Sequence, residues 1–228
     1  MEIRSIPSVK ELYKTVHDMV VSFQFPPGSK ISEVQLAESL GVSRTPVRQV
    51  LQELATQKLI SQRPSKGFFS RNITREEIFD LYELRECIEV KSVLLAAQRA
   101  TDEELKGLYD LWETGSMLPA TTPTELLHKR DRDFHIYIAK ISGNKQIVDL
   151  LKNINDRIYF IRWIDMTDKA DKTQREHREI TKHLLDRNGK EAAAVMQKHI
   201  NKRMEYIILS IREAYSRMFT GQLPQKEQ

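Results

Sequence analysis

The first pattern along the chain is a series of three short amphipathic helices. Apolar side chains recur every three or four residues over 9–23, which predicts a helix with one buried stripe. Ser32 and Gln35 form a capping box that begins a second helix, and Gly41 ends it. A third helix follows at once, with an apolar stripe of Val47, Val50, Leu51 and Leu54. Two helices joined by a tight turn predict a helix-turn-helix unit.

A β-hairpin is expected directly after the third helix. Residues 59–63 and 68–71 have strand character, and the segment 64–67 (PSKG) has the composition of a turn. Such a hairpin is the wing of a winged helix-turn-helix. Gly67 lets the backbone come close to a sugar-phosphate chain, and Lys66 offers a positive charge to it.

The rest of the chain has helical spacing from Thr74 onward. We expect a helix from Thr74 through Ala96, and further helices over 101–114, 124–141, 145–166, 171–187 and 188–219, with a loop at 115–123. The fold class predicted is therefore mostly α. A winged helix-turn-helix domain occupies 1–72, an all-helical bundle occupies 73–220, and a flexible tail occupies 221–228.

Composition excludes several classes of protein. With 40% hydrophobic and 30% charged residues, the chain suits a soluble globular protein rather than a disordered one. It has no run of about 20 apolar residues that would span a bilayer and no signal-peptide core, so we expect no membrane partner and a cytoplasmic location. The single cysteine, Cys87, allows no disulfide framework, and we expect it to be a small buried core residue.

Charge is distributed unevenly along the chain. Residues 1–72 carry ten basic and six acidic side chains, so the whole net charge of +4 lies in this part. Arg44, Arg48 and Gln52 are spaced by four and share one face near the start of the third helix. Solvated surface charge is the usual explanation for such a pair of arginines. In a helix-turn-helix, however, this face of the second helix contacts bases in the major groove. We favour this second interpretation for Arg44 and Arg48.

A second group of polar residues lies in the helical part. Asp131 and His135 are four residues apart, so both project from one helix face and can bind one metal ion, although such pairs are common without a metal. His177 and His199 lie on two later helices, and both can face the bundle interior.

The N-terminal part resembles the GntR family of bacterial regulators. The resemblance lies in residues 27–33 (PGSKISE) and in 41–48 (GVSRTPVR), which follows the family signature without a gap. It implies that Arg44 and Arg48 read the operator, with Thr45 and Gly67 near the backbone. The full set expected at DNA is Ser43, Arg44, Thr45, Arg48, Lys66 and Gly67. Position 34, often Arg or another polar residue in relatives, is Val34 here, so no contact is assigned to it.

The part from Thr74 onward resembles the FCD domain, the ligand-sensing domain of the FadR-type branch of that family. The matching pieces are Glu83-Leu84-Arg85, Asp131-x-x-Phe134-His135, Gly143-Asn144, Glu176-His177 and His199. The resemblance implies a site for a divalent ion (zinc, nickel or manganese) formed by Asp131, His135, His177 and His199. Coordination positions left open suit a small carboxylate effector. Arg85 is then either a partner of that effector or an ion-pair partner of Glu89 at i+4.

The function expected is that of a DNA-binding transcriptional regulator, not an enzyme. A homodimer on a pseudo-palindromic operator is expected, because one module makes few base contacts. Repression relieved by the effector is the expectation carried by the resemblance, with 70–74 as the hinge. The main alternative is a metal-dependent enzyme fused to a DNA-binding module, but no further catalytic motif is present. An architectural DNA-binding protein and a structural zinc are narrower alternatives.

Overall fold

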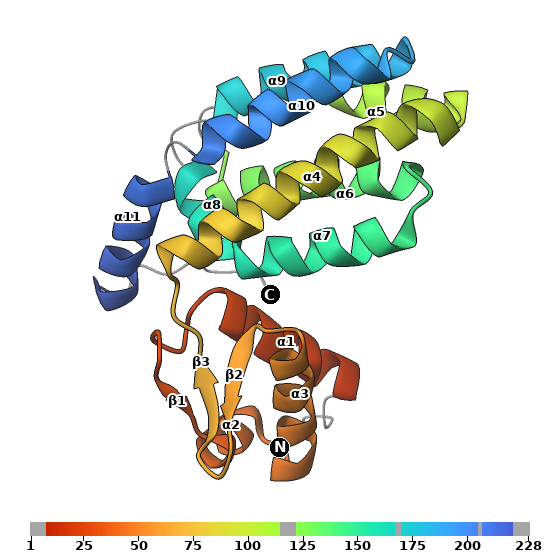
Figure 1. Cartoon of the computed structure of the whole chain (residues 1–228). Helices are drawn as coiled ribbons and strands as arrows, with labels where there is room; N and C mark the ends of the chain where they lie inside the picture. Colours follow the sequence, from red (N-terminus) through yellow and green to blue (C-terminus); the bar gives the residue numbers. More distant parts are fainter. Residues whose placement is uncertain (1–7, 115–121, 167–169, 205–206, 221–228) are drawn as a thin grey trace. The chain divides into compact units, whose positions relative to one another are not determined.

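The computed structural model describes residues 8–114, 122–166, 170–204 and 207–220 (Figure 1). Its residues belong to two compact units, one within Met1–Ile73 and Tyr215–Gln228 and the other within Thr74–Ala214. Tyr215 belongs to the first unit, where its hydroxyl donates a 2.7 Å hydrogen bond to the carbonyl of Ile73. The domain boundaries predicted from the sequence, 1–72 and 73–220, differ from these units in the placement of residues from Tyr215 onward, and they stay a prediction.

The first unit combines three helices with a small antiparallel sheet. The helices are α1 (Val9–Val21), α2 (Glu33–Leu40) and α3 (Arg44–Thr56), and the strands are β1 (Lys30–Ile31), β2 (Ile60–Arg63) and β3 (Gly67–Ser70). The strand order is β1-β3-β2, with Ile31 opposite Phe68 and Arg63 opposite Gly67. The wing hairpin is as expected. The strand β1 was not predicted, because two residues are too few to show an alternating pattern.

Local signals explain where these helices begin and end. Ser8 and Glu11 form a capping box at the start of α1. The C-cap of α2 is Gly41, whose φ of 65° lies in the left-handed region. Helix α1 ends at Val21, earlier than the sequence predicted, and Phe23 that follows has a φ of 55°. The core of the unit is apolar and fully buried, with Val16, Val47, Leu51, Leu54 and Phe68 among its members.

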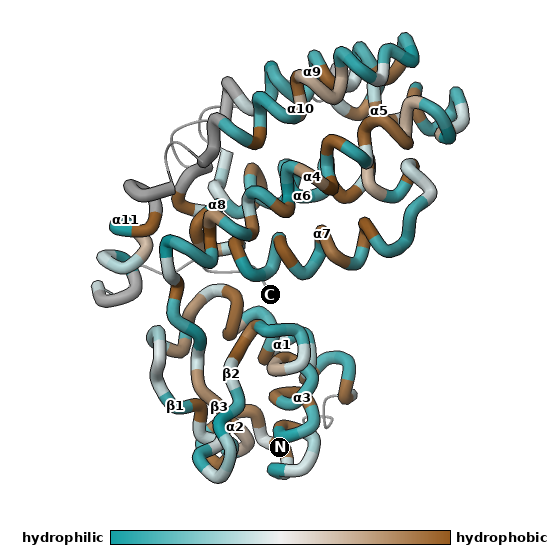
Figure 2. The backbone as a smooth tube through the Cα atoms, viewed as in Figure 1, coloured by the Kyte–Doolittle hydropathy of each residue, from teal (hydrophilic) through white to brown (hydrophobic). Residues whose placement is uncertain are grey.

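The second unit is a helical bundle built around α4 (Arg75–Arg99), which packs against α6, α7, α9 and α10 (Figure 1). Its other helices are α5 (Asp102–Thr114), α6 (Thr124–Ile141), α7 (Lys145–Arg157), α8 (Tyr159–Met166), α9 (Ala170–Leu185) and α10 (Gly189–Met204). The last helix, α11 (Ile207–Thr220), is divided between the units, since its residues from Tyr215 onward belong to the first. Apolar residues lie along α7 and its neighbours (Figure 2), and part of the core consists of Leu95, Ala139, Ile147 and Leu151. No helix in the described ranges is long and apolar enough to cross a membrane.

Several boundaries within the bundle differ from the prediction. The helix expected over 145–166 is two helices, separated at Ile158, where ψ changes to 5°. The helix expected over 188–219 appears as α10 and α11, and residues 205–206 lie outside the described residues. The tail 221–228 and most of the loop 115–123 lie outside them too. Apolar periodicity runs on through these breaks, so it did not reveal them.

Cys87 is exposed, so the expectation of a buried core cysteine is wrong. It lies on α4 two residues after Arg85 and two residues before Glu89, and both of these are buried. Residues two positions apart on a helix point to different sides. Because the polar pair occupies the inward side of α4, Cys87 faces solvent.

Candidate metal centre and nucleic-acid interface

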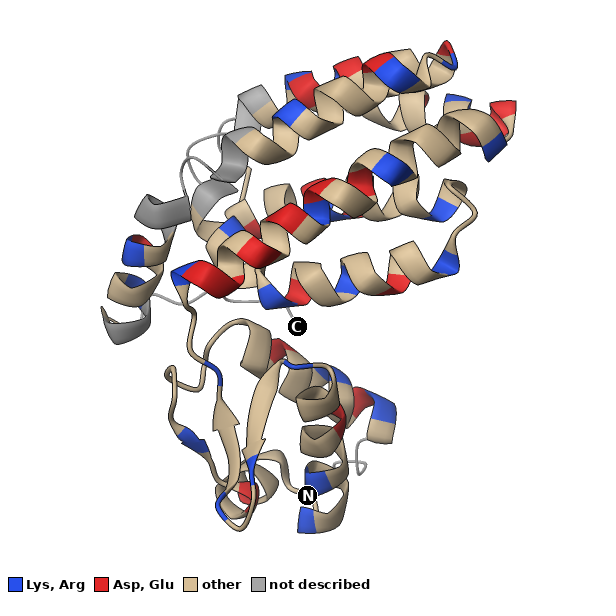
Figure 3. Ribbon diagram, in the orientation of Figure 1, with Lys and Arg blue, Asp and Glu red and all other residues tan. Residues whose placement is uncertain are grey.

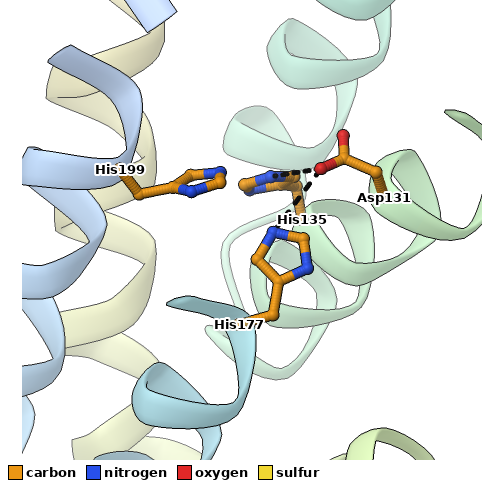
Figure 4. Close-up of side chains that lie close together, drawn as sticks. All are labelled: Asp131, His135, His177 and His199. Atoms are coloured by element: carbon orange, nitrogen blue, oxygen red, sulfur yellow. Dashed lines mark ion pairs between the residues drawn. The ribbon is translucent and has the colours of Figure 1, made fainter. Parts of the chain in front are cut away.

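Four side chains from three helices meet inside the bundle. Asp131 and His135 lie on α6, His177 lies on α9 and His199 lies on α10 (Figure 4). Each offers one ligand atom, and these atoms all lie within 4.8 Å of one another. All four side chains are buried. The structure thus brings together the four residues singled out in the sequence, whereas ligation of a metal by them stays a prediction.

The geometry of this cluster fits a divalent ion. Oδ1 of Asp131 lies 3.5 Å from Nε2 of His177 and 3.8 Å from Nε2 of His135. Ligand atoms at about 2.0–2.2 Å from a common ion are roughly 3–4 Å apart, so little movement is needed to bind one. Imidazole nitrogens with one carboxylate suit zinc, nickel and manganese.

Two glutamates hold the outer nitrogens of two of the histidines. Glu89 on α4 contacts Nδ1 of His135, and Oε2 of Glu176 on α9 lies 2.8 Å from Nδ1 of His199. A carboxylate at Nδ1 favours the tautomer in which Nε2 carries the lone pair, and it orients the ring. Both contacts therefore favour an Nε2 whose lone pair is available to a ligand. Sequence reasoning considered Glu89 only as a partner of Arg85 and gave Glu176 no role.

Arg85 and Glu89 form a buried ion pair on α4. Arg85 is fully buried, and its Nε contacts Oε1 of Glu89. Burial alone would raise the pKa of the Glu89 carboxyl, but the charge of Arg85, followed by the contributions of His135 and Arg162, holds that pKa well below its usual range. Nη2 of Arg85 is buried and has no hydrogen bond among the described residues. Of the two roles considered for Arg85, the ion pair with Glu89 is therefore present in the structure. Binding of an effector by Nη2 of Arg85 stays a prediction.

Arg162 on α8 was missed by the sequence analysis. Only 4% of the residue is exposed, and Nη2 contacts Oδ2 of Asp131. Nη1 donates a 3.2 Å hydrogen bond to Oδ1 of Asn155. Arg162 belongs to no motif and lies 31 residues after Asp131 in the sequence, so only the fold shows that it reaches the cluster.

Aromatic rings close one side of the cluster. The Phe134 ring stacks on the His177 ring with centroids 3.8 Å apart, and the Trp112 ring lies 5.5 Å from His177. All three residues are buried. Apolar walls exclude water and strengthen the electrostatic interactions inside them.

In the first unit, α3 presents a basic face. Ser43 stands at the N-cap of α3, although its side chain makes no capping hydrogen bond. Ser43, Arg44, Thr45 and Arg48 are all exposed, whereas the apolar stripe predicted for this helix is buried. No acidic residue occupies the first turn. This part of α3 therefore has the positive charge and exposure that a recognition helix needs (Figure 3).

The wing adds further basic side chains. Lys66 is exposed in the turn between β2 and β3, and Gly67 has a φ of 91°, a conformation that other residues rarely adopt. A side-chain carbon of Lys30 on β1 lies 3.8 Å from the position that a Cβ at residue 67 would occupy. Lys30 thus joins the wing through the strand that was not predicted. The Arg63 guanidinium lies 4.1 Å from the centroid of the Phe69 ring.

Comparison with known proteins identifies both parts of the chain. Residues 8–69 match the bacterial regulatory proteins of the gntR family, and residues 80–202 match the FCD domain. The Nta operon transcriptional regulator of Aminobacter aminovorans is 39% identical over 202 residues, covering 89% of this chain and 95% of that protein. An uncharacterized HTH-type transcriptional regulator of Bacillus subtilis, YdhC, is 29% identical over 204 residues, covering 88% and 91%.

The fold also has a counterpart among solved structures. A GntR regulator from Rhodococcus sp. RHA1, described as a putative transcriptional regulator, aligns with a TM-score of 0.69 and 21% identity. The alignment covers 88% of this chain and 97% of that one. At this identity the likeness concerns the fold alone.

Proposed function

Because the chain belongs to the GntR family, as a DNA-binding transcriptional regulator with an FCD domain, we propose that a small carboxylic acid controls its operator binding. The acid binds beside a divalent metal ion in the second unit. The observation that carries this proposal is the buried cluster of Asp131, His135, His177 and His199. No catalytic activity is proposed, since the named relatives are regulators.

The chain's own residues prepare the cluster for an ion and an acid. Asp131, His135, His177 and His199 hold the ion, which is zinc, nickel or manganese, and an ion so held offers one or two further positions to a carboxylate. Glu89 and Glu176 hold the imidazole rings in place through Nδ1. Arg85 directs Nη2, which has no hydrogen bond among the described residues, to the acid.

The first unit reads the operator. Arg44 and Arg48 reach base edges in the major groove, and Ser43 and Thr45 lie near the phosphates. Lys66 and Gly67 bring the wing to the sugar-phosphate backbone. Two chains form a homodimer on a pseudo-palindromic site, because one module alone makes few base contacts.

Regulation follows when the acid prefers one arrangement of the two units. A ligand with equal affinity for two states does not change their populations, so the acid must favour one of the two. From the family resemblance, we take this to be the state that binds the operator poorly. The protein is then a repressor that the acid releases, with 70–74 as the hinge.

Metal analysis with a thermal-shift screen tests this proposal. The purified full chain, Asp131→Ala and His177→Ala are analysed for metal and then heated with a panel of small carboxylic acids. His183→Ala is the matched control, since His183 lies on α9 outside the cluster. We expect about one ion per chain in the native protein and the control, none in the two variants, and stabilisation by an acid only where the ion is present.

Two results would contradict the proposal. A native protein without bound metal, whose stability matches that of the variants, would remove the metal site. Metal that stabilises the chain while every acid leaves it unchanged would make the ion structural.

A further inference from the structure

Buried charge is concentrated around the cluster. Among the described residues, the buried Asp, Glu, Lys and Arg side chains are Arg85, Glu89, Asp131 and Arg162. They are joined in one line of contacts through a histidine, in the order Arg85, Glu89, His135, Asp131, Arg162. Such groups are almost never fully buried unless they are paired, so this line is a built feature of the site.

The four charges cancel before any ion binds. Two guanidinium groups face two carboxylates, so the buried side chains carry no net charge. A divalent ion adds two positive charges, and no further buried carboxylate remains among the described residues to balance them. Glu176 contributes one negative charge, but its side chain is 15% exposed, so water partly solvates that charge. An unbalanced buried charge is strongly unfavourable, so the ligand must supply negative charge.

We propose that the effector carries two negative charges, as a dicarboxylic acid does, and that Arg162 selects for the second one. This inference rests on the proposed function and specifies the acid. One carboxylate lies at the ion, and Arg162 and Arg85 face the other. Arg162 is placed for this task by Asp131 and Asn155, which hold its guanidinium at the cluster. Arg85 contributes a buried Nη2 that has no hydrogen bond among the described residues.

The alternative role for Arg162 is to orient Asp131 alone. An arginine acting only in this way supports metal binding and is indifferent to the charge of the acid. The two roles therefore differ in metal content and in the preference for a dianion.

The experiment compares acids that have the same shape and differ by one charge. Dicarboxylic acids of graded length, such as succinate and glutarate, and their monoamides are titrated calorimetrically into the metal-loaded full chain. We expect at least one diacid to bind about tenfold or more tightly than its monoamide, because a hydrogen bond to a charged group contributes this much. In Arg162→Gln this ratio falls toward one while the metal is retained.

Arg157→Gln is the matched control. Arg157 on α7 pairs with Glu77 at 2.5 Å, outside the buried line, so this variant keeps the ratio. Equal binding of diacid and monoamide by the native chain would overturn the inference, as would an unchanged ratio or a lost metal in Arg162→Gln. If the metal is retained and no acid of either charge binds, the proposed effector function fails and this inference fails with it.

Asn155→Asp provides a second variant that keeps Arg162. The new carboxylate stands where Oδ1 of Asn155 accepts from Arg162, so it neutralises the guanidinium in place. We expect weaker binding of the diacid, with unchanged metal content and unchanged binding of the monoamide. Undiminished diacid binding in this variant would overturn the inference even if Arg162→Gln fails to fold.

Discussion

His199 on α10 and Glu176 on α9 are joined by a 2.8 Å contact between Nδ1 and Oε2. The contact orients Nε2 of His199 toward the other three members of the cluster. A carboxylate that acts through a metal-binding histidine contributes to metal affinity without touching the ion.

Substituting Glu176→Gln tests this positioning role. We expect metal affinity to fall by about 10–100-fold, because the ring loses its carboxylate partner while the four ligands remain. Competition with a chelator of known affinity measures the change. Glu179→Gln, an exposed glutamate on the same helix, is the control and keeps native affinity. Equal metal affinity in both variants would show that the contact does not tune the site.

Removing the metal is expected to lower stability. An ion that binds only the folded chain stabilises it by about 2.7 kcal/mol at a hundredfold excess over its dissociation constant. Dialysis against a chelator should therefore lower the melting temperature, and returning the ion should restore it. Asp131→Asn should show no such response, since it lacks the carboxylate ligand. A chelator-insensitive melting temperature in the native chain would contradict the metal site.

Gly189 is expected to be required where α10 meets α4. A Cβ built at Gly189 would lie 2.8 Å from Cβ of Ala97, closer than side chains tolerate. Gly189→Ala should lower the free energy of unfolding by about 1–3 kcal/mol, as overpacking does. In an Ala97→Gly background the same change should be nearly neutral, which chemical denaturation can measure.

Gly107→Ala is the control for this prediction. Its Cβ would meet the Tyr137 hydroxyl at an ordinary 3.6 Å, and the site is exposed on α5. Because alanine favours a helix by about 1 kcal/mol over glycine, this change should stabilise the chain. Destabilisation of equal size at both glycines would show that the contact with Ala97 is not the cause.

Arg48 and Lys66 should affect DNA binding differently. Arg48→Ala is expected to weaken operator binding by about 1–3 kcal/mol and to relax base preference, because it removes a contact to a base edge. Lys66→Ala should weaken binding to all DNA sequences by a similar factor. It should also reduce the slope of log affinity against log salt concentration by about one, because one phosphate contact is lost. Anisotropy on a selected duplex and on a scrambled one, at several salt concentrations, separates the two effects. Unchanged operator affinity in Arg48→Ala would contradict the assignment of α3 as the recognition helix.

Much of the fold could be predicted because its signals are local. Helical spacing, the capping residues and Gly41 are properties of short segments, and they placed α2, α3 and the wing hairpin. The break at Ile158 and the strand β1 depend on tertiary packing, which overrides such patterns. Cys87 illustrates the same limit, since its exposure follows from the polar pair that occupies the inward side of α4.

The four residues of the candidate metal site were predicted from the sequence, but Arg162 beside them was not. Asp131 and His135 share a helix face by spacing alone, and resemblance supplied His177 and His199. Arg162 lies on another helix with no sequence signal, so only the fold brings it to Asp131. Contacts of this kind join residues far apart in the chain, and a single sequence does not contain them.

Control of operator binding by an acid is the central claim, and one titration tests it most directly. A duplex selected by the protein from a random pool is held at constant salt with the metal-loaded chain, and the stabilising acid is added while anisotropy is followed. We predict a loss of DNA affinity of about 5–150-fold, the usual range of coupling between two sites, and no response in Asp131→Ala. Equal DNA affinity with and without the acid, or the same loss in Asp131→Ala, would contradict the claim.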